Sequence, residues 1–194
     1  MTTTPSGVFV LKRAFRIRAR AVRAMLSAAE VETRSQQIAA RLLELPDVRQ
    51  AQTIFCYVSQ GSEVGTHGLI RGWLATGKRV MVPAFDSRRQ LYRPVWLHDF
   101  DRDLAPGQLG ILEPRTFAPA GDAANIAIVP GVAFDAQGHR LGHGKGYYDE
   151  MLHSFVGLKI ALAFDCQILP TVPATDHDVP MDVVVTETTV YRRT

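Results

Sequence analysis

The order of apolar and polar residues divides the chain into short buried strands separated by amphipathic segments. Short apolar runs rich in β-branched and aromatic residues are typical of strands covered on both faces. Such runs predict strands at 53–58, 79–85, 91–97, 125–131, 159–165 and 182–187. Pro94 lies in the run at 91–97. Because proline cannot donate a ladder hydrogen bond, we expect that strand at an edge of the sheet.

Apolar residues at helical spacing lie between the strands and before the first one. Residues 9–26 fit a basic helix, and residues 66–77 fit a second helix that Gly77 closes. "SAAE" at 27–30 is a capping box, which predicts that Ser27 begins a helix ending before Pro46. A short helix is predicted from Tyr148. The expected core positions of the helices are Leu11, Phe15, Val22, Leu26, Val31, Ile38, Leu42, Leu45, Tyr148, Met151, Leu152 and Phe155.

The alternation of strand and helix predicts an α/β fold with a largely parallel sheet and helices on both faces. The sequence contains no internal repeat and no low-complexity linker. We therefore expect one domain over residues 9–194, preceded by a flexible tail at residues 1–8.

Composition narrows the class of protein. The chain has 194 residues, of which 46% are hydrophobic and 21% charged, as in ordinary globular proteins. No apolar run approaches the roughly 18 residues of a membrane span. Cys56 and Cys166 lack metal-ligand spacing, so we expect two buried thiols, a reducing cytoplasm and no membrane association.

The net charge of +3 is unevenly distributed, because residues 1–29 contain no acidic side chain. The cations of this segment are Lys12, Arg13, Arg16, Arg18, Arg20 and Arg23. Organelle transit peptides, nucleic-acid-binding arms and helices that face an anionic ligand all share this pattern. The sequence has no aromatic-rich RNA motif or recognition helix that would favour nucleic acid.

The stretch "RLGHGKGYYDEML" at 140–152 is the main candidate for chemistry. It lies between a predicted strand and a predicted helix, where α/β proteins bind ligands. Its glycines permit either close approach of backbone N–H groups to an anion or a tight structural turn. Lys145 offers a point charge and Arg140 a planar fork for phosphate oxygens. The spacing matches neither a Walker A loop nor G-x-G-x-x-G.

Asp149 follows the glycines and falls in the first turn of the predicted helix. The residues alone leave two roles open: compensation of the helix dipole and binding of Mg²⁺ beside phosphates. A serine hydrolase is excluded by motif, because no G-x-S-x-G elbow is present.

Taken with its flanks, "VPGVAFDAQGHRLGHGKGYYDEML" resembles the signature of the 5-formyltetrahydrofolate cyclo-ligase (methenyltetrahydrofolate synthetase) family. The resemblance extends from about Lys12 to Glu187 and includes "KRAFR", "YVSQGSEVGT", "GILEP" and "FDCQILPTVPATDHDVPMDVVVTE". It implies a three-layer α/β/α fold similar to the sugar-isomerase/CoA-transferase type. It also implies ATP- and Mg²⁺-dependent conversion of 5-formyltetrahydrofolate to 5,10-methenyltetrahydrofolate with release of ADP and phosphate, through phosphorylation of the formyl oxygen.

The resemblance assigns roles residue by residue. The ATP-binding positions it implies are Lys12, Arg16, Arg140, Gly142, Gly144, Lys145, Gly146, Tyr147 and Tyr148. The folate-binding positions are Val58, Glu63, His143, Gly144, Lys145, Gly146 and Tyr147. Lys145 and Arg140 match the catalytic cations, and Asp149 and Asp178 match Mg²⁺ ligands. The resemblance also implies that the basic helix belongs to the mature enzyme rather than to a transit peptide. We expect Tyr148 to be a core aromatic residue as well.

One position departs from the family pattern: Leu109 stands before "GILEP", where an aromatic residue is usual. The departure affects affinity for the folate more than reaction type. A nucleotide-binding relative with another substrate or a regulatory role, and an RNA-binding protein that uses the basic helix, remain as alternatives. We expect a monomer that binds ATP and a reduced folate, with no nucleic-acid partner.

Overall fold

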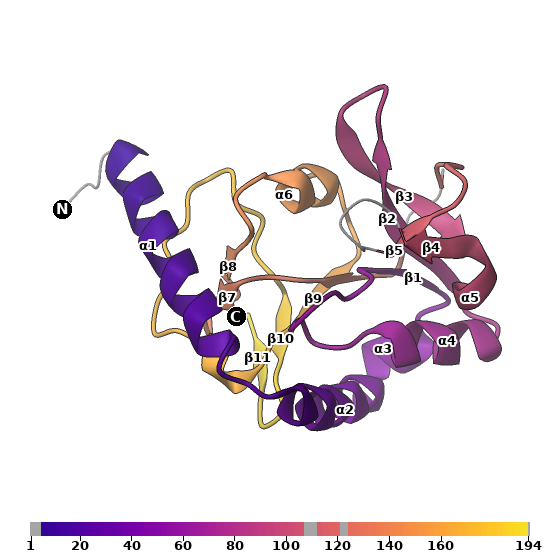
Figure 1. The fold of residues 1–194 in the computed structure, drawn as a ribbon, viewed down its shortest axis with the longest axis horizontal. Helices are drawn as coiled ribbons and strands as arrows, with labels where there is room; N and C mark the ends of the chain where they lie inside the picture. Colours follow the sequence, from indigo (N-terminus) through magenta and orange to yellow (C-terminus); the bar gives the residue numbers. More distant parts are fainter. Residues whose placement is uncertain (1–4, 107–111, 121–123, 194) are drawn as a thin grey trace.

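A computed structural model describes residues 5–106, 112–120 and 124–193 (Figure 1). The described residues form a seven-stranded sheet in the order β11-β10-β9-β6-β1-β2-β3. Its strands are β1 (Thr53–Cys56), β2 (Arg79–Asp86), β3 (Leu91–Leu97), β6 (Ile126–Val129), β9 (Leu158–Leu162), β10 (Val183–Val185) and β11 (Val190–Arg192). Strands β10, β9, β6, β1 and β2 are parallel, and the outermost strands β3 and β11 run antiparallel to their neighbours. The α/β fold with a largely parallel sheet is therefore confirmed.

Each predicted strand is present, including the edge strand that contains Pro94. In β3, Pro94 stands opposite Pro83 of β2, so two residues without an N–H share one rung of the ladder. Several predicted strands are longer than the observed ones, because the chain leaves the sheet at their carboxyl ends. The sequence pattern did not predict β11 or the short pairs β4 (Leu104–Pro106) with β5 (Leu112–Pro114) and β7 (Ala133–Phe134) with β8 (Arg140–Leu141).

The helices cover the sheet from both sides (Figure 1). They are α1 (Pro5–Arg23), α2 (Ala28–Glu44), α3 (Pro46–Gln50), α4 (His67–Ala75), α5 (Phe100–Asp103) and α6 (Tyr147–Leu152), with a 3₁₀ turn, η2, at Asp165–Gln167. Ser27 caps α2 through the predicted capping box, in which the Glu30 N–H donates to the Ser27 hydroxyl and the Glu30 carboxylate accepts from the Ser27 N–H. No described helix is long and apolar enough to span a membrane.

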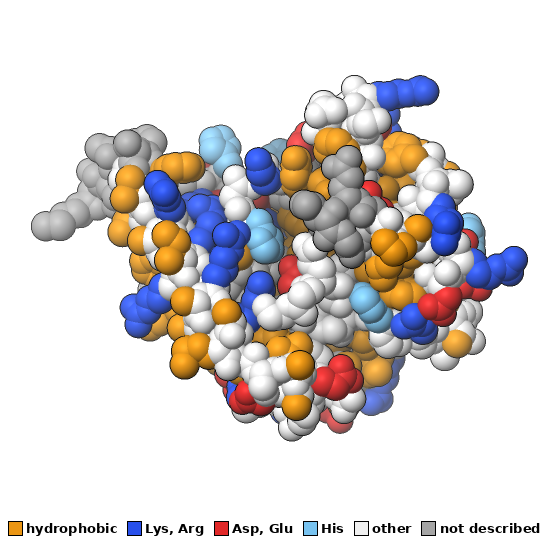
Figure 2. Space-filling model, viewed as in Figure 1, with side chains coloured by type: hydrophobic (Ala, Val, Ile, Leu, Met, Phe, Trp, Pro, Cys, Tyr) orange, Lys and Arg blue, Asp and Glu red, His pale blue; other side chains and the backbone are white. Residues whose placement is uncertain are grey.

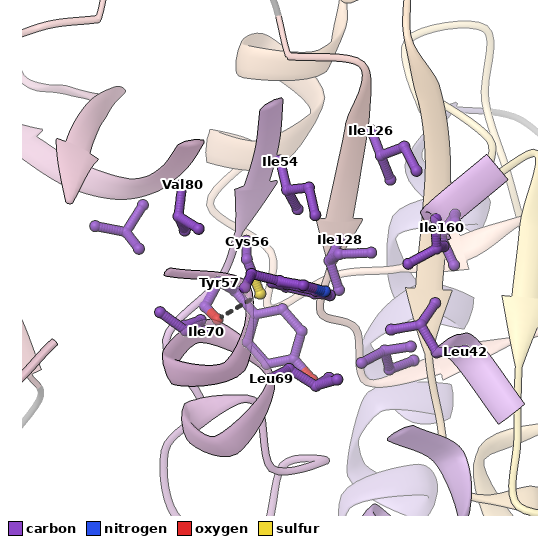
Figure 3. Close-up of a cluster of buried hydrophobic side chains, with 14 of the residues drawn as sticks. Leu42, Ile54, Cys56, Tyr57, Leu69, Ile70, Val80, Ile126, Ile128 and Ile160 are labelled. Carbon is purple, nitrogen blue, oxygen red and sulfur yellow. Dashed lines mark hydrogen bonds between the residues drawn. The ribbon is translucent and has the colours of Figure 1, made fainter. Parts of the chain in front are cut away.

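The two faces of the sheet bury separate apolar clusters, as the alternation of β1 illustrates. Ile54 and Cys56 point toward α2 and α4, where they join Leu42, Ile70 and Ile128 in the larger cluster (Figure 3). Phe55 points to the opposite face and packs in the cluster that contains Leu152 of α6. Because both faces of β1 are buried, its sequence is apolar from Ile54 to Cys56 rather than alternating.

Three expectations at the sequence level were wrong. Residues 5–8 are helical rather than a tail, and Pro5 at the first helical position favours an early start because its missing N–H has no partner there anyway. Leu11 and Val22 are exposed, at 43% and 38%, because α1 turns a different face inward. Cys166 is only half-buried, since it lies in the surface turn η2, whereas Cys56 is fully buried.

Candidate active site

A cavity of about 450 Å³ opens beside the carboxyl ends of β1 and β6, and it is lined by residues of α1 and of the β2–β3 hairpin. Every site residue predicted from the sequence lines it. They are Lys12, Arg16, Val58, Glu63, Arg140, Gly142, His143, Gly144, Lys145, Gly146, Tyr147, Tyr148, Asp149 and Asp178. Residues that lie far apart in the sequence therefore converge on one space, as is usual at the carboxyl edge of a parallel sheet.

The glycine-rich loop runs from β8 into α6, and two of its glycines need a left-handed backbone. Gly144 has φ +100° and Gly146 has φ +72°, values that side chains rarely tolerate. At Gly144 an added Cβ would also lie 3.3 Å from the Arg16 guanidinium carbon. These glycines therefore form a tight turn, as one of the two interpretations of the sequence predicted. The same turn places the loop backbone in contact with Arg16 at the cavity.

Helix α1 supplies two cations of the cavity, Lys12 and Arg16, from its inner face. The Lys12 ammonium lies 2.5 Å from Asp178 Oδ2, and Arg16 Nε donates to the Gly142 carbonyl oxygen at 2.8 Å. Burial, followed by the nearby charge of Arg20, lowers the pKa of Arg16 from its ordinary value. Lys and Arg side chains gather over this helix (Figure 2), where Arg16 and Arg20 contact the glycine loop and Lys12 contacts Asp178.

The two predicted metal ligands each pair with a cation in this structure. Asp149 Oδ1 accepts from Arg140 at 2.7 Å and from the Val179 N–H at 3.2 Å. Asp178 Oδ2 accepts from Lys12 and from both the N–H and the hydroxyl of Thr175. Burial alone would raise the pKa of Asp178, but the bonds from Lys12 and Thr175 outweigh it and the net pKa is lowered.

The described residues contain no group of three or more His, Cys, Asp or Glu side chains placed to hold a metal ion. A site made of protein ligands alone is therefore not present in this part of the chain. Two carboxylates that line one cavity beside a glycine loop nevertheless fit Mg²⁺, which usually takes one or two protein carboxylates and completes its shell with waters and substrate phosphates.

Glu63 is a buried carboxylate, 8% exposed, at the wall of the cavity. It sits in the loop that follows β1, which reciprocal bonds between Ser59 and Thr66 hold closed: each backbone N–H donates to the other residue's hydroxyl at 3.0 Å. The Gln60 N–H donates to Glu63 Oε2 at 3.1 Å, and His143 Nε2 lies 3.5 Å from Oε1. This loop also presents half-buried Val58 to the cavity.

The tyrosines at the start of α6 differ in environment. Tyr148 packs against both core clusters, as predicted, and also lines the cavity. Burial, together with the negative charge of Glu63, raises the pKa of Tyr148 well above its ordinary value. The Tyr147 ring centroid lies 4.9 Å from that of Tyr92 in β3, with the planes tilted by 60°.

Sequence reasoning missed the wall of the cavity that the β2–β3 hairpin and β5 supply. The unpredicted lining includes Phe9, Pro83, Tyr92, Leu112 and Glu113. Tyr92 stands opposite Phe85 in the antiparallel register, and this aromatic pair flanking a turn was the available signal. Leu109, the departure from the family pattern, lies outside the described residues.

The comparisons with known proteins agree over nearly the whole chain. The sequence model of the 5-formyltetrahydrofolate cyclo-ligase family matches residues 9–187. The 5-formyltetrahydrofolate cyclo-ligase of Haemophilus influenzae is 30% identical over 182 residues, which cover 90% of this chain and 97% of that protein. The enzyme of the same name from Escherichia coli strain K12 is 32% identical over 182 residues, which cover 87% of this chain and 96% of that protein.

A solved structure extends the likeness from sequence to fold. The NMR structure of Aquifex aeolicus 5,10-methenyltetrahydrofolate synthetase has a TM-score of 0.83 and 32% identity, and the match covers 94% of this chain and 92% of that one. The family model, the two relatives and the solved structure each match most of this chain. The chain therefore belongs to the 5-formyltetrahydrofolate cyclo-ligase family.

Proposed function

We propose that the protein is an ATP- and Mg²⁺-dependent 5-formyltetrahydrofolate cyclo-ligase that produces 5,10-methenyltetrahydrofolate, ADP and phosphate. The observation that carries the proposal is the convergence of all the predicted nucleotide, folate and metal positions on a single cavity. Cations from α1 and from the glycine loop meet there with the buried carboxylate of Glu63. One cavity thus offers groups suited to a phosphate chain and a group suited to a pterin.

The first step would join the formyl oxygen to the γ-phosphorus of ATP. The bond from this phosphorus to the bridging oxygen breaks, and ADP leaves with the electron pair. The neighbouring folate nitrogen then bonds to the formyl carbon and loses its proton to solvent. The carbon–oxygen bond breaks, and inorganic phosphate takes the electron pair.

Such phosphoryl transfer depends mainly on positioning and charge neutralisation, so cations are the chief requirement. Lys145, exposed at the loop, would neutralise the phosphate as it transfers. Arg140 is 4% exposed, and Asp149 holds its guanidinium at the cavity, so this planar group is oriented before phosphate oxygens replace the carboxylate. Lys12 and Arg16 would bind the remaining phosphates from helix α1, which contacts the glycine loop through Arg16.

Asp149 and Asp178 would hold Mg²⁺ together with the nucleotide phosphates, and the ion would neutralise charge on those oxygens. In this structure their partners are Arg140 and Lys12, which are themselves proposed nucleotide ligands. Binding would therefore exchange carboxylate–cation pairs for phosphate–cation pairs. The exchange keeps each buried charge partnered before and after binding.

On the folate side, Glu63 would accept hydrogen bonds from the donor-rich edge of the pterin, and Tyr147 would pack on its ring. Val58 would add an apolar contact. The inward direction of Lys12 and Arg16 also argues against the RNA-binding alternative, since a nucleic-acid arm presents its cations to solvent.

The test is the absorbance of methenyltetrahydrofolate formed by the purified protein from 5-formyltetrahydrofolate, ATP and Mg²⁺. Lys145→Ala and Asp149→Ala should each abolish most of the ATP-dependent signal. Glu150→Ala is the matched control, because Glu150 is exposed on α6 beside Asp149 and does not line the cavity. A folded wild-type protein that binds ATP without producing the signal would instead support the relative with another substrate.

A further inference from the structure

His143 bridges α1 and the buried carboxylate of Glu63. Arg20 NH2 lies 3.2 Å from His143 Nδ1, and His143 Nε2 lies 3.5 Å from Glu63 Oε1. A guanidinium can only donate hydrogen bonds, so Nδ1 must be the acceptor. The imidazole proton is therefore on Nε2, the nitrogen that faces Glu63.

Each oxygen of Glu63 consequently has a neighbouring N–H group. The Gln60 N–H donates to Oε2 at 3.1 Å, and His143 Nε2 lies 3.5 Å from Oε1, within ion-pair distance. These partners fix the plane of a carboxylate that is 8% exposed. Since each carboxylate oxygen offers about two lone-pair sites, one site on each oxygen remains for a ligand. Two adjacent acceptors of this kind match two adjacent N–H donors on the edge of a pterin.

We propose that Arg20 and His143 are positioning residues that orient Glu63 toward the donor edge of the folate. This inference rests on the proposed function and adds Arg20, which is not among the described residues that line the cavity. Arg20 acts through the imidazole, by holding His143 in the tautomer that carries its proton on the nitrogen facing Glu63. Lys12 and Arg16 lie on the same helix as Arg20, so the helix that meets the nucleotide also orients the Glu63 carboxylate.

The first experiment measures the dissociation constant of 5-formyltetrahydrofolate by calorimetry without ATP. Arg20→Ala should weaken binding by about fivefold, the effect of losing one hydrogen bond to a positioned group. Arg18→Ala is the control, because Arg18 is an equally charged, exposed residue of the same helix. Equal losses in the two variants would mean that Arg20 acts only through its general charge, and would overturn the proposal.

A double-mutant cycle tests the route through Glu63. If Arg20 acts by orienting Glu63, the combination of Arg20→Ala with Glu63→Gln should bind the folate no more weakly than Glu63→Gln alone. Additive losses would show that Arg20 contacts the ligand independently, which contradicts a positioning role.

The tautomer can be measured without any folate, from the ring ¹⁵N shifts of His143 roughly two pH units above the ordinary histidine pKa of about 6.5. The signal is assigned by its loss in His143→Gln. Nδ1 should show the shift of an unprotonated nitrogen in the wild type, and Arg20→Ala should populate both tautomers. A mixed population in the wild type would overturn this inference even in an active enzyme. A wild type that neither binds nor converts the folate would instead reject the proposed function.

Discussion

Lys12 and Asp178 are separated by 166 positions in the chain, yet the Lys12 ammonium lies 2.5 Å from the Asp178 carboxylate. The pair ties the first helix to the loop before β10 at the edge of the cavity. Its energetic consequence follows from the lowered pKa of Asp178, which means that folding favours the ionised carboxylate.

Asp178 should therefore contribute to stability at neutral pH and lose that contribution in acid. A lowered folded-state pKa gives a contribution that is complete above the unfolded value of about 3.9 and is lost as pH falls through the folded value. Asp178→Asn should lower the free energy of unfolding by about 1 kcal/mol at pH 7, with a smaller difference below about pH 3. Urea titrations at the two pH values measure this, and exposed Asp176→Asn is the control. A loss of equal size at both pH values would contradict an ionic role.

Gly144 should be less tolerant of alanine than Gly146. Both have positive φ, so each substitution should cost about 1 kcal/mol of stability. At Gly144 the new methyl group also meets the Arg16 guanidinium, whereas at Gly146 it meets nothing within 4 Å. We expect Gly144→Ala to raise the KM for ATP several-fold more than Gly146→Ala does.

Gly77→Ala is the control for that comparison, because Gly77 has φ +79°, open space around its Cβ and no place in the cavity lining. The Gly77→Ala variant should be less stable than the wild type, and its KM for ATP should be unchanged. Similar kinetic constants for Gly144→Ala and Gly146→Ala would show that contact with Arg16 does not matter for nucleotide binding.

Tyr92 should contribute an aromatic surface to folate binding that the family pattern did not reveal. Its ring lies 4.9 Å from Tyr147, and both line the cavity. Tyr92→Ala should raise the KM for the folate by about fivefold, as expected for loss of an aromatic contact of about 1 kcal/mol. Tyr92→Phe should retain wild-type binding. Phe117→Ala, at an aromatic residue 41% exposed outside the cavity lining, should change nothing. An unchanged KM in Tyr92→Ala would remove this residue from the folate site.

The two thiols should differ in reactivity. Cys56 is fully buried, and burial raises the pKa of its thiol far above the ordinary value. Cys166 is half-buried, and its pKa is raised by burial and by the charge of Glu187. Because the thiolate is the reactive form, an aromatic disulfide reagent should label Cys166 slowly and Cys56 only after unfolding. Rapid labelling of two thiols in the native protein would contradict the packing around β1, and Cys166→Ser identifies the labelled site.

The sequence was informative where one local pattern determined one local structure. Continuous apolar runs located the parallel strands, and "SAAE" located the start of α2, because a capping box satisfies helix N–H groups within four consecutive residues. Pro94 placed β3 at the sheet edge for the same reason: a missing N–H is a local property.

Local pattern could not predict what depends on long-range packing. The apolar spacing on α1 suggested an inward face with Leu11 and Val22, but the helix instead turns Lys12 and Arg16 inward, where they find Asp178 and the loop backbone. The aromatic residues Phe85 and Tyr92 flank a turn, but this local pattern does not indicate that Tyr92 packs against Tyr147, because that contact joins distant segments. The roles of the site residues came from resemblance to the family, whereas their convergence on one cavity is a property of the fold.

The paired prolines of β2 and β3 have a consequence for how the molecule behaves in crowded solution. An outer strand normally offers a row of free N–H and C=O groups that a strand from another copy can join. In β3, Pro94 interrupts that row, and the chain near Pro119 bridges to Val95 beside it. We therefore expect that a strand from another copy does not readily pair with the edge strand β3. Pro94 should thus hinder fibrous aggregation.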